Sequence, residues 1–225
     1  MSSVIEATEP AAQSSEAEIP VQTRSERLRS FDPADFGTPG GREVNWKHTP
    51  VARIAPLFVD EAPDAGAEPA VTYEFEVPAV TRIESIGIEA PVRGEFFMPE
   101  DIVSAIAWKQ SPDAIHLRIP AGEAIAEPMR VRIHGTGAGR HANAQFLIEA
   151  MPQSEATIIL EHTGSANYAQ NVEIIVRDGA RLRVVTVQRW DDDAIHASAH
   201  QARVDRDAYL RHVVVSLGGG LVRVN

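Results

Sequence analysis

Short β-type runs, separated by turn residues, fill the chain from residue 71 to its end and restrict the fold more than any other feature. Each run alternates apolar and polar residues or is apolar throughout, which is typical of strands that bury one face or both. We expect strands at 71–77, 83–88, 115–119, 129–134, 145–149, 157–161, 171–177, 181–189, 195–203 and 209–217. Residues 99–109 instead place apolar side chains at helical spacing and predict a helix.

The runs also repeat along the chain. Segments that begin at residues 127, 155, 179 and 207 can be aligned on one another. The alignment brings four small residues into one column, spaced 28, 24 and 28 apart: Pro128, Ala156, Ala180 and Ala208. A period in the twenties indicates one supersecondary unit stacked on copies of itself, because a single unit cannot bury its apolar face alone. The repeat predicts a mainly β protein with a β-solenoid core; a β-sandwich with evenly spaced strands is the alternative.

Composition divides the chain into three expected parts. At 225 residues and 44% hydrophobic content, the chain is long enough for one sizeable domain plus tails. The parts are a disordered acidic tail at 1–22, a helical and mixed N-terminal region at 23–110 with an acidic loop at 60–70, and a β-helix core at 111–225 that is incomplete at its C-terminal end. Within the second part we expect short helical stretches at 23–30 and 42–50.

Charge and cysteine usage exclude several classes of protein. The net charge is −11, and two acidic pieces carry most of it: residues 1–22 hold four acids and residues 60–76 hold six, with no base in either. Nothing resembles the basic footprint of a nucleic-acid-binding protein. The first 20 residues lack the features of a secretory signal, and no apolar run is long enough to cross a bilayer. Cysteine is absent, so there are no disulfides and no thiolate ligands. We expect a cytoplasmic protein.

Removing residues 1–22 should leave the melting temperature unchanged within error. The segment is rich in Ser, Ala, Glu and Pro and has few large apolar side chains to add to a core. Calorimetry of the shortened and complete chains checks this. A fall of several degrees would mean that the segment packs on the body.

Four motifs in order resemble the SufD family of iron–sulfur cluster assembly proteins. Residues 43–49, Glu-Val-Asn-Trp-Lys-His-Thr, resemble the family's N-terminal Glu-x-x-Trp signature, with His48 at a position that is usually aromatic. Residues 119–128 resemble the entry to its first coil. Residues 171–182 with Val187-Gln188-Arg189-Trp190 are similar to its core pattern. Residues 213–223, with Gly218-Gly219-Gly220, resemble the next coil. The resemblance covers residues 23–225.

The resemblance implies a right-handed parallel β-helix and a non-catalytic role in building iron–sulfur clusters. It implies two partners, the SufB paralogue and the SufC ATPase, and a cluster held only in the context of that complex, with no cofactor bound by this chain alone. Proteins of this family continue beyond a coil such as 217–223, so the chain is a fragment or a natural truncation. The expected consequence is an exposed C-terminal edge and self-association through it.

Candidate site residues give no catalytic, cofactor-binding or metal-binding set. His196 and His200 are about 13 Å apart along a strand, too far for one metal ion, and we expect them on a solvated surface. His134, His141 and His162 are expected at the surface, and Asp191-Asp192-Asp193 in a solvated turn. Residues 135–140 are glycine-rich but lack the Gly-Lys-Ser/Thr of a phosphate loop, which predicts a flexible turn between coils. Trp46 and Trp108 are expected as core anchors where helical segments cover a coil end.

Two other functions stay open from the residues alone. A carbohydrate-binding or lyase-type β-helix protein is the main alternative, although aromatic residues make up only 6% of the chain and few lie in the repeats. A cupin-like enzyme is weaker because its His/Glu ligand pattern is absent. No Ser, His and Asp lie in a context such as G-x-S-x-G. We therefore expect no enzyme.

Overall fold

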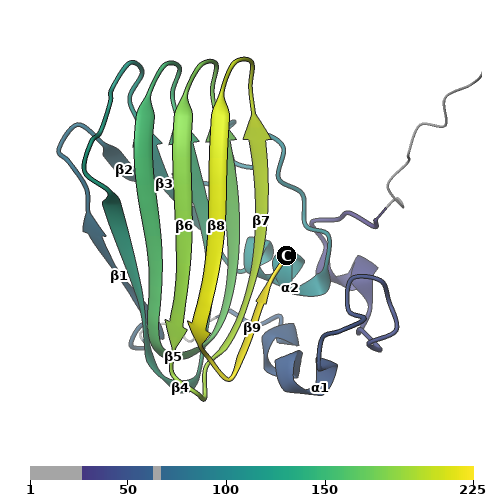
Figure 1. Ribbon diagram of the computed structural model, residues 1–225. Coiled ribbons are helices and arrows are strands. Elements are labelled where there is room, and N and C mark those ends of the chain that lie inside the picture. The colour runs from purple at the N-terminus through teal and green to yellow at the C-terminus, as the bar shows by residue number, and fades with distance from the viewer. Residues whose placement is uncertain (1–26, 63–66) are drawn as a thin grey trace, which may run out of the picture.

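The computed structural model describes residues 27–62 and 67–225. Most of the described chain is β-structure, and its short helices lie in the first half (Figure 1). The strands are β1 (Val71–Glu76), β2 (Arg82–Gly87), β3 (Asp113–Ile119), β4 (Met129–Ala150), β5 (Glu155–Val176), β6 (Arg181–Trp190), β7 (Ile195–Val204), β8 (Tyr209–Gly218) and β9 (Leu221–Val224). The helices are η1 (Pro33–Phe36), α1 (Val51–Ile54), η2 (Ala55–Phe58) and α2 (Ile102–Lys109).

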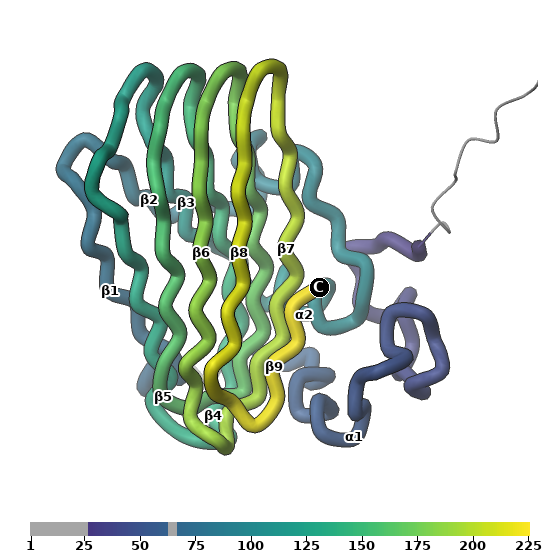
Figure 2. The backbone as a smooth tube through the Cα atoms, viewed as in Figure 1, coloured from purple at the N-terminus to yellow at the C-terminus, as the bar shows by residue number. Residues whose placement is uncertain are grey.

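The core is a β-solenoid. Each coil contributes one segment to each of two sheet faces, and successive coils stack in parallel (Figure 2). The 22-residue strands β4 and β5 pass through both faces, whereas the later coils divide into β6 with β7 and β8 with β9. The first half of β5 pairs with β6 and its second half with β7, and β8 and β9 continue the two faces. This arrangement confirms the predicted solenoid, and the sandwich alternative is wrong.

The sequence alignment of the coils placed some of them out of register. Ala180 was aligned with Ala156, but the structure pairs Ala156 with Leu182, two residues later. Met129 pairs with Ile158, one residue away from its aligned position. Only the last step is correct, because Leu182 pairs with Leu210 at the expected spacing. A two-residue slip keeps the apolar side chains on the same face, so periodicity alone could not detect it.

Alternate side chains of every coil point into the lumen, the interior enclosed between the two faces. Along β6, residues 182, 184, 186, 188 and 190 are buried while their neighbours face solvent. The lumen is apolar over most of its length and contains a continuous cluster of Val, Ile, Leu, Met and aromatic side chains. Ile174 is fully buried in this cluster, between Ile148 of the preceding coil and Ala202 of the following one.

Antiparallel strands begin the solenoid. β1 pairs with the first half of β4, and β2 pairs with β3, which joins the second half of β4 in parallel. These strands cover the first coil and place Tyr73 and Phe75 against the apolar side chains of the lumen. β1 and β2 lie within residues 23–110, the region for which we expected helical and mixed structure. The division of the chain into three parts stays a prediction.

The helical segments pack against one flank of the coils, as Figure 1 shows for α1 and α2. α2 begins with a capping box in which Asp101 accepts a hydrogen bond from the Ser104 amide, and it confirms the predicted helix. Trp46, Leu57 and Val103 form a second apolar cluster with Ala197 of β7. Asp101 also accepts a hydrogen bond from Arg223 of β9 at 2.8 Å, which ties this layer to the last coil.

Two details of the N-terminal region differ from expectation. Residues 27–30 are not helical, and 42–50 form turns before α1 begins at Val51. Trp46 and Trp108 are buried, as expected. Trp46 packs on the flank of the coils rather than on a coil end, and Trp108 stacks on Phe97. The tail at 1–22 lies outside the described residues, as does part of the acidic loop. Among the described residues, no helix is long and apolar enough to cross a membrane.

Candidate functional site

Four aromatic rings form a buried polar cluster in the lumen, which we call the lumen cluster: His162, Tyr168, Trp190 and His196. Their solvent-exposed fractions are 0 to 3%, and their ring centroids lie 5.0 to 6.3 Å apart. The solenoid brings them together, because Tyr168 and His196 occupy the same position in successive coils and His162 faces them from the other sheet. His196 and Tyr168 stack with an angle of 15° between their planes.

Amide side chains and a backbone oxygen are hydrogen-bond partners of some ring nitrogens in the lumen cluster. His162 Nε2 lies 3.0 Å from Gln170 Oε1, and Trp190 Nε1 donates to Gln188 Oε1 at 2.7 Å. His196 Nδ1 lies 3.1 Å from the carbonyl oxygen of Tyr168. His162 Nδ1 and His196 Nε2 are buried and lack a hydrogen-bond partner among the described residues. Such unpaired buried nitrogens cost less free energy as neutral lone pairs than as charged donors.

Burial therefore keeps the imidazoles of the lumen cluster neutral. It lowers the pKa of His162 to about 4. It also holds the pKa of His196 well below the usual range, and the nearby His162 lowers it further. A neutral imidazole can accept a hydrogen bond or offer a lone pair, but these two cannot act as proton donors to solvent near neutral pH. The two imidazoles of the lumen cluster therefore do not fit the role of a general acid or a general base.

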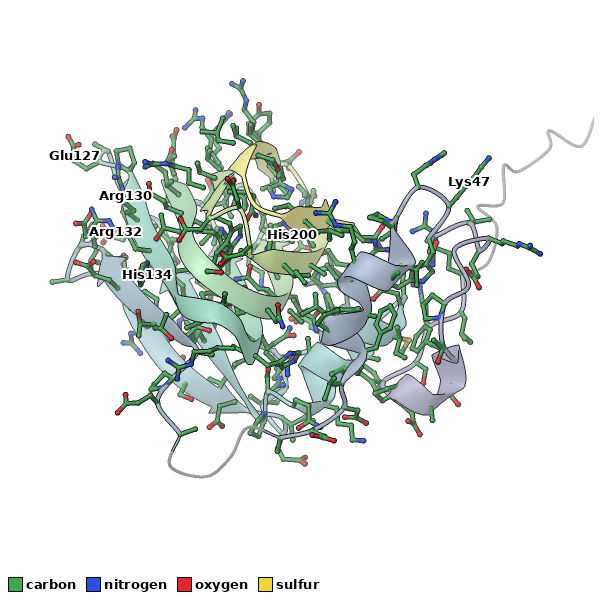
Figure 3. All side chains as sticks on the ribbon, turned by 90° about the horizontal axis from the view of Figure 1, so that it is seen from below. Lys47, Glu127, Arg130, Arg132, His134 and His200 are labelled. Atoms are coloured by element: carbon green, nitrogen blue, oxygen red, sulfur yellow. The ribbon has the colours of Figure 1, made fainter. Side chains whose placement is uncertain are left out.

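A second histidine pair lies where the described coils end. His200 Nδ1 is 3.1 Å from His212 Nε2, and the two rings stack with centroids 5.0 Å apart. Burial and the neighbouring His212 lower the pKa of His200 to about 3. His212 is exposed, since no later strand covers β8 among the described residues. Figure 3 shows His200 on the last strands of the solenoid.

Several sequence predictions about histidines were wrong. His162 and His196 are fully buried, not on the surface, and His141 is half-buried. His141 and His162 fell outside the predicted strands, whereas the structure places them within β4 and β5. For His196 the strand was predicted correctly, but not the side to which the residue points. His134 is exposed, as predicted, on the outer side of β4 together with Arg130 and Arg132 (Figure 3).

The acidic run Asp191-Asp192-Asp193 lies in an exposed turn between β6 and β7, as predicted. The Ser165 hydroxyl donates to Asp193 Oδ1 at 2.6 Å. His196 and His200 both face the lumen but belong to different ring groups. Within residues 27–62 and 67–225, no group of three or more His, Asp or Glu side chains has an arrangement that holds a metal ion.

Glu161 and His162 point to opposite sides of β5, as expected for adjacent strand residues. Glu161 accepts a hydrogen bond from Arg189 on the outer face, while His162 faces the lumen. The glycine-rich residues 135–140 are not a turn between coils; they form a bulge in the middle of β4, where the register with β5 shifts. Gly135 is needed there because a Cβ would lie 2.4 Å from the Ser165 carbonyl oxygen.

The sequence patterns did not predict a network of charged side chains around Glu149 and Arg177. Glu149 Oε1 accepts from Arg177 Nε at 2.8 Å, and Glu149 Oε2 lies 3.2 Å from His116 Nε2. Burial alone would raise the pKa of Glu149, but hydrogen bonds from His116 and Arg177 lower it. Arg177 also binds Glu95, in the turn segment before α2, at 2.7 Å. The network fixes that segment to the coils.

A numerical signal for this network was present in the sequence. Four acid–arginine pairs are each 28 residues apart: Glu149 with Arg177, Glu155 with Arg183, Glu161 with Arg189, and Asp178 with Arg206. Arg177, Arg183 and Arg189 reach back diagonally, because the ladder at each of them joins residues 26 apart, whereas Asp178 and Arg206 keep the 28-residue offset of the ladder beside them. Counting such pairs would have given the coil length to within two residues.

Comparison with known proteins agrees with the family resemblance of the sequence motifs. Residues 132–225 match the family model described as the SufBD core domain of the SUF system for FeS cluster assembly. An iron–sulfur cluster assembly SufBD family protein of Mycobacterium bovis is 35% identical over 202 residues, which cover 90% of this chain and 50% of that protein. A SufBD family protein of Mycobacterium leprae is 35% identical over 196 residues, 87% of this chain and 49% of that protein.

The chain spans about half the length of the curated relatives it matches. No solved structure matches it significantly. The residues that match the core-domain model coincide with the stacked coils from β4 to β9. The alignment with the Mycobacterium bovis protein covers 202 residues and therefore includes the helical segments as well. On these grounds the chain belongs to the SufB/SufD-type family of iron–sulfur cluster assembly proteins.

Proposed function

We propose that this chain is a SufD-type, non-catalytic subunit of a SufB–SufC–SufD scaffold in the cytoplasm, where it supports cluster assembly and iron acquisition. The observation that carries the proposal is the core-domain match over residues 132–225, which coincides with the stacked coils. The partners follow from the family role: a SufB paralogue and a SufC ATPase. No feature of the described residues favours the carbohydrate or cupin alternatives.

The side-chain chemistry supports a role that depends on other subunits. The chain contains no cysteine, so it supplies no thiolate to a cluster. Its buried histidines pack on one another and on Trp190 instead of converging on a common point. An iron–sulfur cluster would therefore be cargo of the assembled complex, held largely by ligands from another subunit, and this chain would bind no cofactor by itself.

Co-purification tests this proposal. The tagged chain is co-expressed with SufB-type and SufC-type subunits of the same organism, and a full-length SufBD relative serves as the matched positive control. We expect SufB to be retained together with the chain, with iron bound only in the multi-subunit fraction. Retention by the full-length relative but not by this chain would contradict the proposal for these 225 residues.

The isolated chain should not bind ATP. The glycine-rich residues 135–140 are part of a strand and carry no Lys or Ser, so they form no phosphate-binding loop. Titration calorimetry with ATP and Mg²⁺ should give no saturable heat. Micromolar affinity, abolished by Arg140→Ala, would show that this bulge binds phosphate after all.

The purified 225-residue chain should self-associate through its last coil. Val214 and Val204 face the lumen side but are 39% and 45% exposed, and β8 has one ladder partner, β6, among the described residues. Such an edge pairs readily with another chain. Light scattering should detect oligomers at tens of micromolar, and Val214→Lys should disperse them. A monodisperse parent chain that Val214→Lys leaves unchanged would contradict this.

A further inference from the structure

The outer face of the two strands β6 and β8 is an uncovered surface of unusual composition. We call it the β6–β8 outer face; it consists of alternate residues of β6 from 181 to 189 and of β8 from 209 to 217. Figure 1 shows these strands side by side at the front of the molecule, while the helices pack on another flank. The surface therefore belongs to the solenoid but takes no part in holding the helical layer.

Positive charge accumulates on this face although the whole chain carries a net charge of −11. Neither β6 nor β8 contains Asp or Glu, and four arginines point outward: Arg181, Arg183, Arg189 and Arg211. Arg183 and Arg189 bind Glu155 and Glu161 of β5. Among the described residues, Arg181 and Arg211 form no ion pair, so two arginines at one end of the face lack a carboxylate partner.

The strand register places like charges next to each other. Arg183 and Arg211 are direct partners in the parallel ladder, and the next position in that row, on β5, is Thr157. Like charges at neighbouring ladder positions destabilise a sheet unless an anion compensates them. Among the described residues, Arg183 has an ion pair with Glu155, whose side chain is itself 45% exposed, and Arg211 has none. A carboxylate from outside the chain would relieve this repulsion.

The centre of the same face is apolar. Val185 pairs with Val213, and Val187 with Val215, so four valines form two adjacent rows across the strands. Tyr209 and Leu217 at the two ends of β8 are 47% and 70% exposed. A contiguous apolar centre with charged and aromatic residues at its border is the composition of a protein interface.

We infer that the β6–β8 outer face docks an acidic protein surface, one with an apolar centre bordered by carboxylates. The valine rows would meet the apolar centre, and the carboxylates would bind Arg181, Arg183 and Arg211. Free phosphate or nucleic acid would use the guanidinium groups but not the valines, and the chain's net negative charge opposes a polyanion. The inference goes beyond the proposed scaffold role and does not depend on it.

Fluorescence anisotropy of a labelled acidic helical peptide tests the inference on the complete chain. The peptide carries a leucine stripe bordered by glutamates, and a second peptide replaces the leucines by serine. We expect saturable binding of the first peptide that weakens with salt and falls at least tenfold in the double variant Arg183→Glu, Arg211→Glu. The variant Val185→Ser, Val213→Ser should reduce it by a similar factor.

Arg206→Glu is the matched control, since Arg206 is exposed on a turn outside the face and the charge change per site is the same. It should leave the affinity within twofold. Equal loss in the control, or equal binding of the serine peptide, would overturn the inference in favour of non-specific charge attraction. Tighter binding of heparin than of the first peptide would overturn it in favour of a phosphate or sulfate site. Sedimentation should show no change of oligomeric state in the arginine double variant; a change would identify a second copy as the occupant.

Discussion

Replacing Ile174 by aspartate should prevent the chain from reaching its native fold at 37 °C. Ile174 is fully buried in the lumen, and its neighbours in the adjacent coils are Ile148 and Ala202, so the new carboxylate would have no partner. Burial of an unpaired charge is one of the few mechanisms that cost more than about 4 kcal/mol. We expect loss of the cooperative unfolding transition, measured by circular dichroism.

Two further substitutions keep this test informative if the aspartate variant is insoluble. Ile174→Val should fold and lose only about 1 kcal/mol, because it removes one buried methyl group. Asp192→Ala, in the exposed turn before β7, should change the free energy of unfolding by less than about 0.5 kcal/mol. An Ile174→Asp chain that melts like the parent would show that this residue does not face the lumen.

Acid should destabilise the fold well above the pH at which carboxylates normally titrate. In the folded chain, burial lowers the pKa of His162 to about 4 and of His200 to about 3, and the pKa of His196 is also strongly lowered. In the unfolded chain each imidazole has a pKa near about 6.5. Above that value all three are neutral in both states and contribute nothing to the pH dependence.

As the pH falls below about 6.5, the unfolded chain binds protons that the folded chain cannot, so the free energy of unfolding decreases. Each histidine contributes a slope of up to about 1.4 kcal/mol per pH unit until its folded pKa is reached. Three histidines therefore give up to about 4 kcal/mol per pH unit between pH 6 and 4. Urea titrations at half-unit pH steps measure this slope.

His162→Gln provides the internal control for the acid effect. Glutamine can still hydrogen-bond Gln170 but does not titrate, so the slope should decrease by about one proton while stability at pH 8 changes less. His116 and Arg177 lower the pKa of Glu149, so its contribution to the free energy of unfolding is lost only below about pH 4.5. Above that pH, the slope therefore reports the histidines. A flat free energy between pH 7 and 5 would mean that these histidines are hydrated.

The sequence predicted the kind of structure but not the facing of its residues. Alternation predicted strand structure in each element from β1 to β8, although it divided β4 and β5 in two and missed β9, and helical spacing identified α2. Both signals are local. Whether His162 or His196 faces the lumen depends on where a strand meets its neighbour about 28 residues away, and a slip of one residue reverses it. The small-residue column gave the period only approximately, because Ala180 marks a turn and not the position of Ala156.

The candidate site was less predictable than the fold for the same reason. The lumen cluster combines residues from both faces of two coils, and nothing in a linear sequence marks His162 and Trp190 as neighbours. The charge network at Glu149 was accessible in principle, because its 28-residue spacing recurs in three other pairs. An arginine that lies one coil beyond a carboxylate is a signal of stacking and not of chemistry.

The 28-residue ion pairs also determine how the molecule resists force. Each pair joins one coil to the next, and within the stack the same two coils are held by a full parallel ladder. A pull applied to the C-terminus along the stacking axis therefore loads the outermost coil first, since the ladder bonds of that coil lead to the coil behind it. The solenoid would unfold stepwise, one coil at a time from its last described coil. Arg223 and Arg177 join two separate coils to α2 and to the turn segment before it, so these bonds would resist those steps.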